Sequence, residues 1–187
     1  MFPPDYGPRS ANVLSENHSL ICKMPELTVT SPLEPLTLVE ADGAIIELDW
    51  GQTHNEERSQ LLKSAQAELT SYFTGELENF SLPLNPVGTV FQKKVWHQMV
   101  EIPYGEALKY GDVAKNLSSS PRAVGGACGR NPIPIIIPCH RIIGTNDKLT
   151  GYTSAGGTKT KSFLLDLESH QAELPLANMA HKSESPT

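Results

Sequence analysis

Residues 118–143 read SSSPRAVGGACGRNPIPIIIPCHRII, and this stretch decides how the second half of the chain folds. Ser120 followed by Pro121 is a strong helix start, because serine caps the first turn and proline tolerates the first helical position. A short helix is therefore expected from Arg122 to about Gly129. The prolines that follow exclude a helix, so residues 134–138 are predicted to be extended, buried and stiff.

The residues just before this stretch predict a partner for that helix. Residues 108–117 form a second short helical segment, and the two segments together make a candidate helix-turn-helix. Ala123, Gly125, Gly126 and Ala127 are small, which would let another element approach the second helix closely. Further helices are expected over 89–101 and 158–168, where apolar residues recur at helical spacing.

The first half has a different pattern. Three short runs rich in β-branched residues predict strands, and Asp42-Gly43 predicts a tight hairpin between the last two. A helix should follow, with an apolar face that includes Leu69 and Tyr72 and a stop at Gly75. We expect a small antiparallel sheet packed on one helix, and nothing in this half suggests catalysis. The expected elements are 27–30, 36–40, 44–50 and 56–73.

Charge also divides the chain of 187 residues. The net charge is −6 overall, but it is −9 over 1–87, +4 over 88–168 and −1 over 169–187. This asymmetry favours a polyanion partner for the second half only. A proline-rich stretch at 82–88 indicates a linker. We therefore expect a disordered tail (1–23), a supporting α/β domain (24–87), a second functional domain (88–170) and a flexible tail (171–187).

Other functional classes are disfavoured by composition. The sequence contains no run of 18 apolar residues, so no membrane-spanning helix is expected. The polar N-terminus has no apolar segment typical of a secretory signal. The three cysteines lack regular spacing, which argues against a disulfide framework and favours a reducing compartment.

Cys139 is the candidate nucleophile. A thiol is mostly protonated at neutral pH, and the adjacent His140 could accept its proton directly or through a water molecule. The histidine would then need a carboxylate or a carbonyl to fix its tautomer, as in a Cys/His/acid triad. A small buried cysteine without a role is the alternative, and metal binding is disfavoured because no second pair of ligands has suitable spacing. Cys128 is expected to pack within the second short helix.

Pro138-Cys139-His140-Arg141 resembles the active-site signature of the O6-alkylguanine-DNA alkyltransferases. Residues 122–127 and 131–134 are similar to that family's recognition helix and the loop after it, and the similarity covers 88–168. The first half resembles the family's smaller domain more loosely. The resemblance implies an α+β protein with a ribonuclease H-like N-terminal domain and a mainly helical, winged-helix-like C-terminal domain that carries the helix-turn-helix.

The resemblance also implies roles for individual residues. Cys139 would accept the alkyl group, His140 would act as its base through a water molecule, and Glu168 would orient the histidine. Tyr110 would donate to N3 of the leaving guanine and contact the DNA backbone. Arg122 would fill the gap left by the flipped nucleotide, beside the DNA-contacting Ala123, Gly125 and Gly126. The implied pocket and hinge residues are Asn131, Pro134, Ile142, Tyr152 and Thr153.

The implied function is DNA repair by irreversible, single-use transfer of an alkyl group from O6 of guanine in duplex DNA to Cys139. The O4-alkyl group of thymine is a second candidate substrate. The loop 152–157 is two residues longer than the family's usual Tyr-Ser-Gly-Gly, so either Thr153 or Ala155 could supply the backbone N–H near the substrate. A non-catalytic protein that only flags lesions is the main alternative, although such proteins carry tryptophan in place of the cysteine. A transcription factor and a thiol hydrolase fit less well.

The sequence also leads to expectations about cofactors, partners and cellular location. We expect no cofactor, no metal and no membrane association, and we expect a monomer whose partner is double-stranded DNA carrying O6-alkylguanine. A bacterial protein of this kind would be cytoplasmic and a eukaryotic one nuclear, and neither would be secreted.

Overall fold

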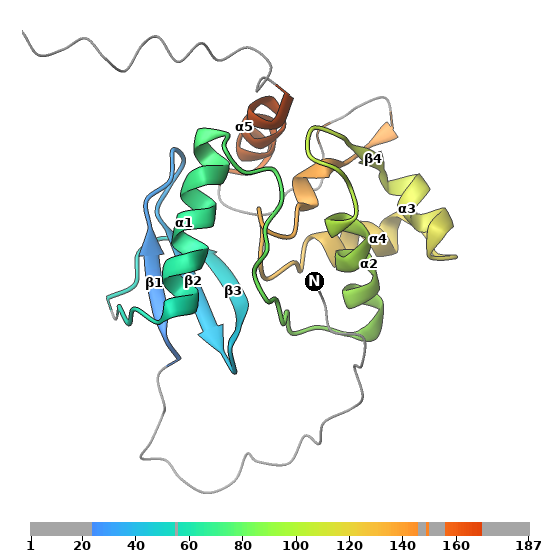
Figure 1. The fold of residues 1–187 in the computed structure, drawn as a ribbon. Helices are drawn as coiled ribbons and strands as arrows, with labels where there is room; N and C mark the ends of the chain where they lie inside the picture. Colours follow the sequence, from blue (N-terminus) through green and yellow to red (C-terminus); the bar gives the residue numbers. More distant parts are fainter. Residues whose placement is uncertain (1–23, 55, 146–148, 150–155, 170–187) are drawn as a thin grey trace, which may run out of the picture.

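The computed structural model describes residues 24–54, 56–145, 149 and 156–169, which form a sheet-and-helix half and a helical half in contact with each other (Figure 1). This arrangement confirms the predicted α+β class. The predicted tails, 1–23 and 171–187, lie outside the described residues. No helix in the described ranges is both long and apolar enough to cross a bilayer.

The first half is an antiparallel sheet covered by one helix. Strands β1 (Glu26–Val29), β2 (Leu36–Ala41) and β3 (Ala44–Trp50) pair in that order. Asp42 and Gly43 both have positive φ, 51° and 73°, which confirms the predicted tight turn. Helix α1 (Gln60–Thr74) packs on β1 and β2 and ends at Gly75, with φ 82°.

Helix α1 begins later than predicted. The apolar spacing predicted a start at residue 56, but Ser59 is the N-cap and its side chain accepts a hydrogen bond from the Leu62 N–H. Glu57 instead donates its N–H to the Glu26 carbonyl at 2.8 Å, and Glu56 forms a bridge to the same residue. Pairing with the edge of β1 therefore takes these two residues out of the helix.

The second half is mainly helical. It contains α2 (Val90–Val100), β4 (Leu108–Lys109), α3 (Tyr110–Asn116), α4 (Pro121–Cys128), the single-turn 3₁₀ helix η1 (Cys139–Arg141), β5 (Ile142–Ile143) and α5 (Thr158–Ser169). Ser120 caps α4, and its hydroxyl accepts the Ala123 N–H at 3.2 Å, as predicted. Helix α3 starts at Tyr110 rather than Leu108, because Leu108 and Lys109 pair in parallel with Ile142 and Ile143.

The segment that leads to Cys139 is buried as predicted, but it is not extended. Ile135 has φ +74°, and the Ile136 N–H donates to the Pro134 carbonyl at 2.9 Å, which closes a tight turn around Ile135. The Cys139 N–H donates to the Ile137 carbonyl at 2.8 Å in a second such turn. A β-branched residue rarely adopts positive φ, so surrounding packing must hold this conformation.

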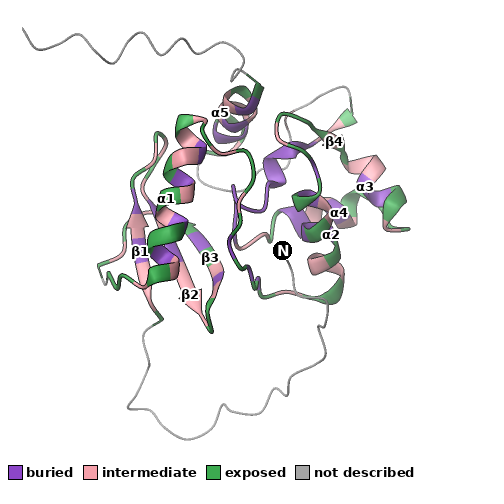
Figure 2. Cartoon of the chain, viewed as in Figure 1, coloured by how far each residue is buried: buried purple, intermediate pink, exposed green. Residues whose placement is uncertain are grey.

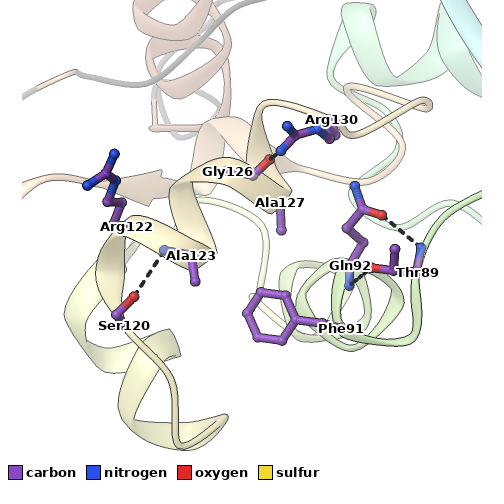
Figure 3. A pocket seen from close by; sticks show the side chains of 9 residues that line it. All are labelled: Thr89, Phe91, Gln92, Ser120, Arg122, Ala123, Gly126, Ala127 and Arg130. Atoms are coloured by element: carbon purple, nitrogen blue, oxygen red, sulfur yellow. Dashed lines mark hydrogen bonds between the residues drawn. The ribbon is translucent and has the colours of Figure 1, made fainter.

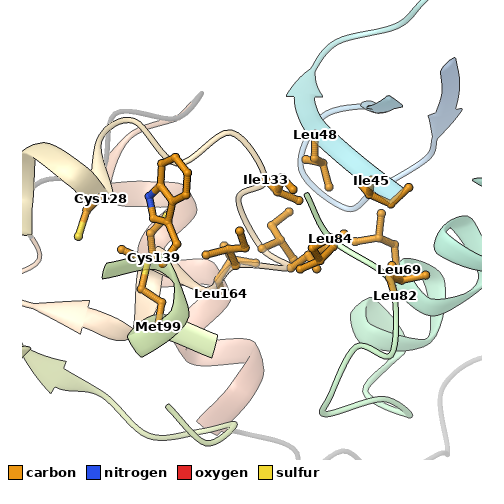
Figure 4. Packing of buried hydrophobic residues seen from close by; sticks show 14 of the residues in the cluster. Ile45, Leu48, Leu69, Leu82, Leu84, Met99, Cys128, Ile133, Cys139 and Leu164 are labelled. Atoms are coloured by element: carbon orange, nitrogen blue, oxygen red, sulfur yellow. The ribbon is translucent and has the colours of Figure 1, made fainter. Parts of the chain in front are cut away.

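Packing supplies that support from both halves. Buried residues form one apolar cluster that runs from Ile45 and Leu48 on the sheet to Ile133 and Leu164 in the helical half (Figures 2 and 4). The Leu48 N–H also donates to the Pro132 carbonyl at 2.8 Å. The sheet is therefore attached by its backbone to the segment that positions Cys139.

Candidate active site

Cys139 begins η1, directly after Pro138, and only 6% of it is exposed. Burial raises the pKa of its thiol, whereas a hydrogen bond from the Asn131 side chain and the charge of Lys161 lower it. Because burial is the largest influence, the thiol is protonated at rest. A nucleophilic Cys139 therefore needs a nearby group that removes its proton.

His140 follows Cys139 in the sequence, is fully buried and contacts Glu168, the acid that the family resemblance implies. Its Nε2 lies 2.7 Å from Oε1 of Glu168, while Nδ1 has no hydrogen-bond partner among the described residues. Burial lowers the pKa of His140, and the charges of Arg141 and Lys161 act in the same direction against the opposing effect of Glu168. A carboxylate can only accept, so a neutral His140 donates from Nε2 and keeps Nδ1 as the basic nitrogen.

Glu168 is the shared hydrogen-bond acceptor for polar side chains of the site. Arg141 donates to it twice, from Nε to Oε2 at 2.8 Å and from Nη2 to Oε1 at 3.0 Å. Burial alone would raise the pKa of Glu168, but the hydrogen bonds from His140 and Arg141, together with the charge of Arg141, outweigh it and lower the pKa to about 2. The acid is therefore ionised at neutral pH, and Arg141, two residues after Cys139, is its counter-ion.

Tyr72 completes this cluster from the other half of the chain. Its hydroxyl donates to Oε1 of Glu168 at 2.8 Å, and the residue is fully buried. The first half, in which nothing in the sequence suggested catalysis, therefore contributes a hydrogen bond to this cluster. The residue was identified only as one position on the apolar face of a helix, and a hydroxyl on that buried face is the one signal for a polar partner.

Lys161 is a second residue that the sequence analysis missed. It is fully buried on α5, its ammonium group donates to the Ile142 carbonyl, and Nζ lies 5.7 Å from the centroid of the Tyr110 ring. Burial lowers the pKa of Lys161, and the nearby Cys139 and Cys128 raise it. The available signal was its position on the same helical face as Leu164 and Glu168, where a lysine is unexpected.

Asn131, Pro134 and Ile142 belong to the stretch of chain that contains Cys139. Asn131 donates from Nδ2 to the Ile137 carbonyl at 2.8 Å and accepts the Ile133 N–H at 3.0 Å, so it ties both ends of the turn-containing segment together. Pro134 is buried within that segment, and Ile142 pairs with Leu108. The predicted Tyr152 and Thr153, and the two-residue extension of their loop, lie outside the described residues.

The helix-turn-helix presents the remaining predicted residues at the surface. Arg122 is exposed near the start of α4, and a hollow of about 500 Å³ between α3 and α4 is lined by Tyr110, Arg122 and Gly125 among others. A Cβ at Gly125 would lie 3.8 Å from the Tyr110 ring, so these two residues are close neighbours. Burial raises the pKa of Tyr110, and the two cysteines raise it further, which keeps its hydroxyl a hydrogen-bond donor.

A wider groove of about 710 Å³ lies on the other side of α4, against the first turn of α2 (Figure 3). Arg122 and Arg130 border it near either end of α4, with the small Ala123 and Gly126 between them. Arg130 is held by a hydrogen bond from Nη1 to the Gly126 carbonyl at 3.1 Å. Two positive groups flanking a small-residue surface suit a polyanion.

Comparisons with known proteins agree with this geometry. Residues 26–86 match the family model described as the ribonuclease-like domain of 6-O-methylguanine DNA methyltransferase, and residues 90–170 match that of its DNA binding domain. The methylated-DNA--protein-cysteine methyltransferase of Methanosarcina acetivorans is 53% identical over 114 residues, which are 60% of this chain and 72% of that protein. The constitutive enzyme of that name from Bacillus subtilis is 43% identical over 154 residues, covering 75% of this chain and 93% of its own.

Solved structures show the same similarity. The O6-methylguanine methyltransferase of Mycobacterium tuberculosis superposes with a TM-score of 0.72 at 40% identity, covering 82% of this chain and 97% of that one. A structure of the Mycobacterium tuberculosis OGT protein in complex with DNA gives a TM-score of 0.69 at 42% identity, covering 76% and 91%.

Proposed function

The chain belongs to the 6-O-methylguanine DNA methyltransferase family, and from this premise we propose that it repairs DNA by moving an alkyl group from O6 of guanine to Cys139. The observation that carries the proposal is the buried His140–Glu168 pair directly after Cys139, 2.7 Å from histidine to acid, in which Nδ1 of the histidine has no hydrogen-bond partner among the described residues. The residue roles below belong to the proposal.

The transfer begins with removal of the thiol proton. Nδ1 of His140 takes this proton through a bridging water molecule, and the ionised Glu168 stabilises the imidazolium that results. The Cys139 sulfur then attacks the alkyl carbon. A new S–C bond forms as the C–O6 bond breaks, and its electron pair goes to the guanine, whose developing charge Tyr110 reduces by donating to N3. The thioether product is stable, so each molecule acts once.

Access to O6 requires the nucleotide to leave the base stack. This extrusion costs a few kcal/mol, and it costs less for a damaged, poorly paired base. The exposed Arg122 at the start of α4 is suited to fill the gap in the duplex, as wedge side chains do in other minor-groove proteins. The small residues Ala123, Gly125 and Gly126 let α4 approach the groove closely without contacts that depend on base sequence. The O4-alkyl group of thymine is a second substrate to test.

Mass spectrometry tests the function directly. The protein is incubated with a duplex containing one O6-methylguanine, and we expect a gain of about 14 Da, one methyl group, localised to Cys139. The variant Cys128→Ser is the matched control, because it removes the neighbouring buried thiol and should gain the same mass. If the wild-type protein binds this DNA and never gains the mass, the chain is a lesion-binding protein.

We also propose that the protein acts as a monomer in a reducing compartment and needs no cofactor, because direct displacement by one thiolate requires no second reagent. Light scattering during size-exclusion chromatography should give the mass of one chain. Treatment with a chelator should leave the rate of methyl transfer unchanged, and a loss restored by added metal would contradict the proposal.

A further inference from the structure

Tyr72 and His140 share one oxygen atom of the catalytic acid. The Tyr72 hydroxyl is 2.8 Å from Oε1 of Glu168, and His140 Nε2 is 2.7 Å from the same Oε1. The tyrosine comes from α1, which lies in the ribonuclease-like half, 96 residues before the acid in the sequence. All three side chains are buried, so water does not compete for this contact.

We propose that Tyr72 is a positioning residue of the alkyl-transfer site, which fixes Oε1 of Glu168 and limits how strongly that oxygen supports the His140 imidazole. The inference rests on the proposed function and adds a group from the first half to its machinery. An oxygen that accepts a hydrogen bond from a hydroxyl offers less negative charge to a second donor. Tyr72 therefore makes His140 a weaker base than it would be if Oε1 of Glu168 accepted hydrogen bonds from His140 and Arg141 alone.

The geometry favours this role over simple packing. The Tyr72 ring is held by edge contacts with Phe73, at 5.4 Å between centroids, and Tyr104, at 6.1 Å. These contacts fix the ring without its hydroxyl. The hydroxyl remains protonated, because burial and then the charge of Glu168 raise the pKa of Tyr72 well above its ordinary value. It therefore acts as a permanent donor to Glu168.

The other charged and titratable groups around the acid come from every neighbouring element. Arg141 on η1 lies against Oε1 and Oε2, and Lys161 on α5 lowers the pKa of His140 from the side of Cys139. Tyr104, in the loop after α2, interacts electrostatically with Glu168 and, more weakly, with Glu78. None of these groups loses its own contact when the Tyr72 hydroxyl is removed, so its effect can be measured separately.

The variant Tyr72→Phe keeps the ring and deletes the hydroxyl. We expect the pKa of His140 to rise, which moves the acidic limb of the rate profile for alkyl transfer to higher pH by about half a unit. Below that limb the rate should fall about threefold, because the rate there changes tenfold per pH unit, and above it the rate should change less than twofold. Long-range nitrogen NMR of labelled histidine, assigned with His140→Asn, should show the same shift without substrate.

The matched control is Tyr104→Phe, which deletes a hydroxyl in the same aromatic cluster that donates to the Leu167 carbonyl at 3.5 Å and not to Glu168. Its profile should coincide with that of the wild type. Replacing Tyr72 by 3-fluorotyrosine, which keeps the fold and strengthens the donor, should move the limb and the NMR titration in the opposite direction.

The outcomes separate the two proposals. If the wild-type protein gains no methyl group, the proposed function fails, and the NMR titration still tests Tyr72. If the wild type reacts but Tyr72→Phe loses the same factor at every pH and His140 titrates unchanged, the residue is structural and the inference is overturned. Unchanged titration with 3-fluorotyrosine would overturn it as well.

Discussion

Arg141 and Glu168 form a buried ion pair with two hydrogen bonds, 2.8 Å from Nε to Oε2 and 3.0 Å from Nη2 to Oε1. A third hydrogen bond runs from Nη1 of Arg141 to the Ile102 carbonyl at 2.7 Å. The arginine thus links the turn that carries Cys139 to α5 and to the end of α2. The positive charge of Arg141 balances the negative charge of the ionised Glu168, and this allows His140 to stay uncharged beside the acid.

Arg141→Met should therefore destabilise the protein strongly. Removing one partner leaves the Glu168 charge buried without its main counter-ion, which typically costs about 3–5 kcal/mol. Arg58→Ala is the control, because its 3.3 Å pair with Glu56 is exposed and such pairs contribute about 0–1 kcal/mol. Urea unfolding of both variants measures the difference. Equal midpoints for the two variants would show that the buried pair adds no stability.

The low pKa of Glu168 predicts that the protein loses stability over a defined range of acidic pH. Its pKa is about 2 in the folded protein against an ordinary value of 4.5, so its contribution is fully present above 4.5 and is lost as the pH falls towards 2. This contribution to the free energy of unfolding is at most about 3 kcal/mol, because a difference of one unit in pKa corresponds to about 1.4 kcal/mol. The stability gap between wild type and Glu168→Gln should therefore narrow as the pH falls through this range.

Measurement of unfolding free energy between pH 6 and pH 2.5 checks this expectation. The same variant should also transfer the methyl group more slowly at neutral pH, because an amide stabilises the His140 imidazolium less well than a carboxylate. A gap that stays constant with pH would mean that Glu168 is not ionised in the fold, and an unchanged transfer rate would mean that another acid orients His140.

Lys161→Met should slow alkyl transfer. The Lys161 charge lowers the pKa of Cys139, so its removal leaves burial less opposed and reduces the thiolate fraction. We expect about a tenfold lower rate with free O6-benzylguanine at pH 7, which corresponds to about one pH unit, and a smaller loss at higher pH. Lys159→Met, on the exposed side of α5, should react like the wild type. A loss that is the same at every pH would assign Lys161 a structural role.

Several of these contacts could not be predicted from the sequence. The Cys139–His140–Glu168 set followed from a local motif and a family resemblance, and the caps at Ser120 and Gly75 followed from short-range chemistry. Tyr72 reaches Glu168 across 96 residues, and no local pattern distinguishes it from a core aromatic. A burial pattern likewise does not state which carbonyl a lysine will reach, as Lys161 does at Ile142.

The sequence pattern also could not predict the backbone conformation of the loop before Cys139. Prolines correctly excluded a helix, but the positive φ of Ile135 arises from packing in a cluster built by both halves. In the same way, α1 begins at Gln60 rather than at residue 56, because residues 56 and 57 pair with β1. Tertiary contacts determine both of these conformations, because such contacts override local propensity where the two compete.

Arg122→Ala should separate base extrusion from chemistry. The side chain is exposed on α4 and lies apart from the Glu168 cluster, so the reaction with free O6-benzylguanine should stay within about twofold of the wild type. Repair of O6-methylguanine in a duplex should fall much further, because the extruded nucleotide leaves an unfilled gap. Arg130→Ala, at the other end of α4, should weaken DNA binding without this selective loss. Equal losses on both substrates for Arg122→Ala would exclude the wedge role.

Affinity for undamaged duplex should be modest and should fall with salt. Residues 88–168 carry a net charge of only +4, and two of their cations, Arg141 and Lys161, are buried in the site and unavailable to phosphates. Few phosphates can then be neutralised, so the slope of log affinity against log salt should be small, about −2 to −4 at about −0.9 per phosphate. Removing Arg130 should reduce that slope by about one if it contacts a phosphate. Fluorescence anisotropy between 50 and 300 mM salt measures the slope, and an affinity that does not change over this range would contradict an electrostatic contact between α4 and the DNA backbone.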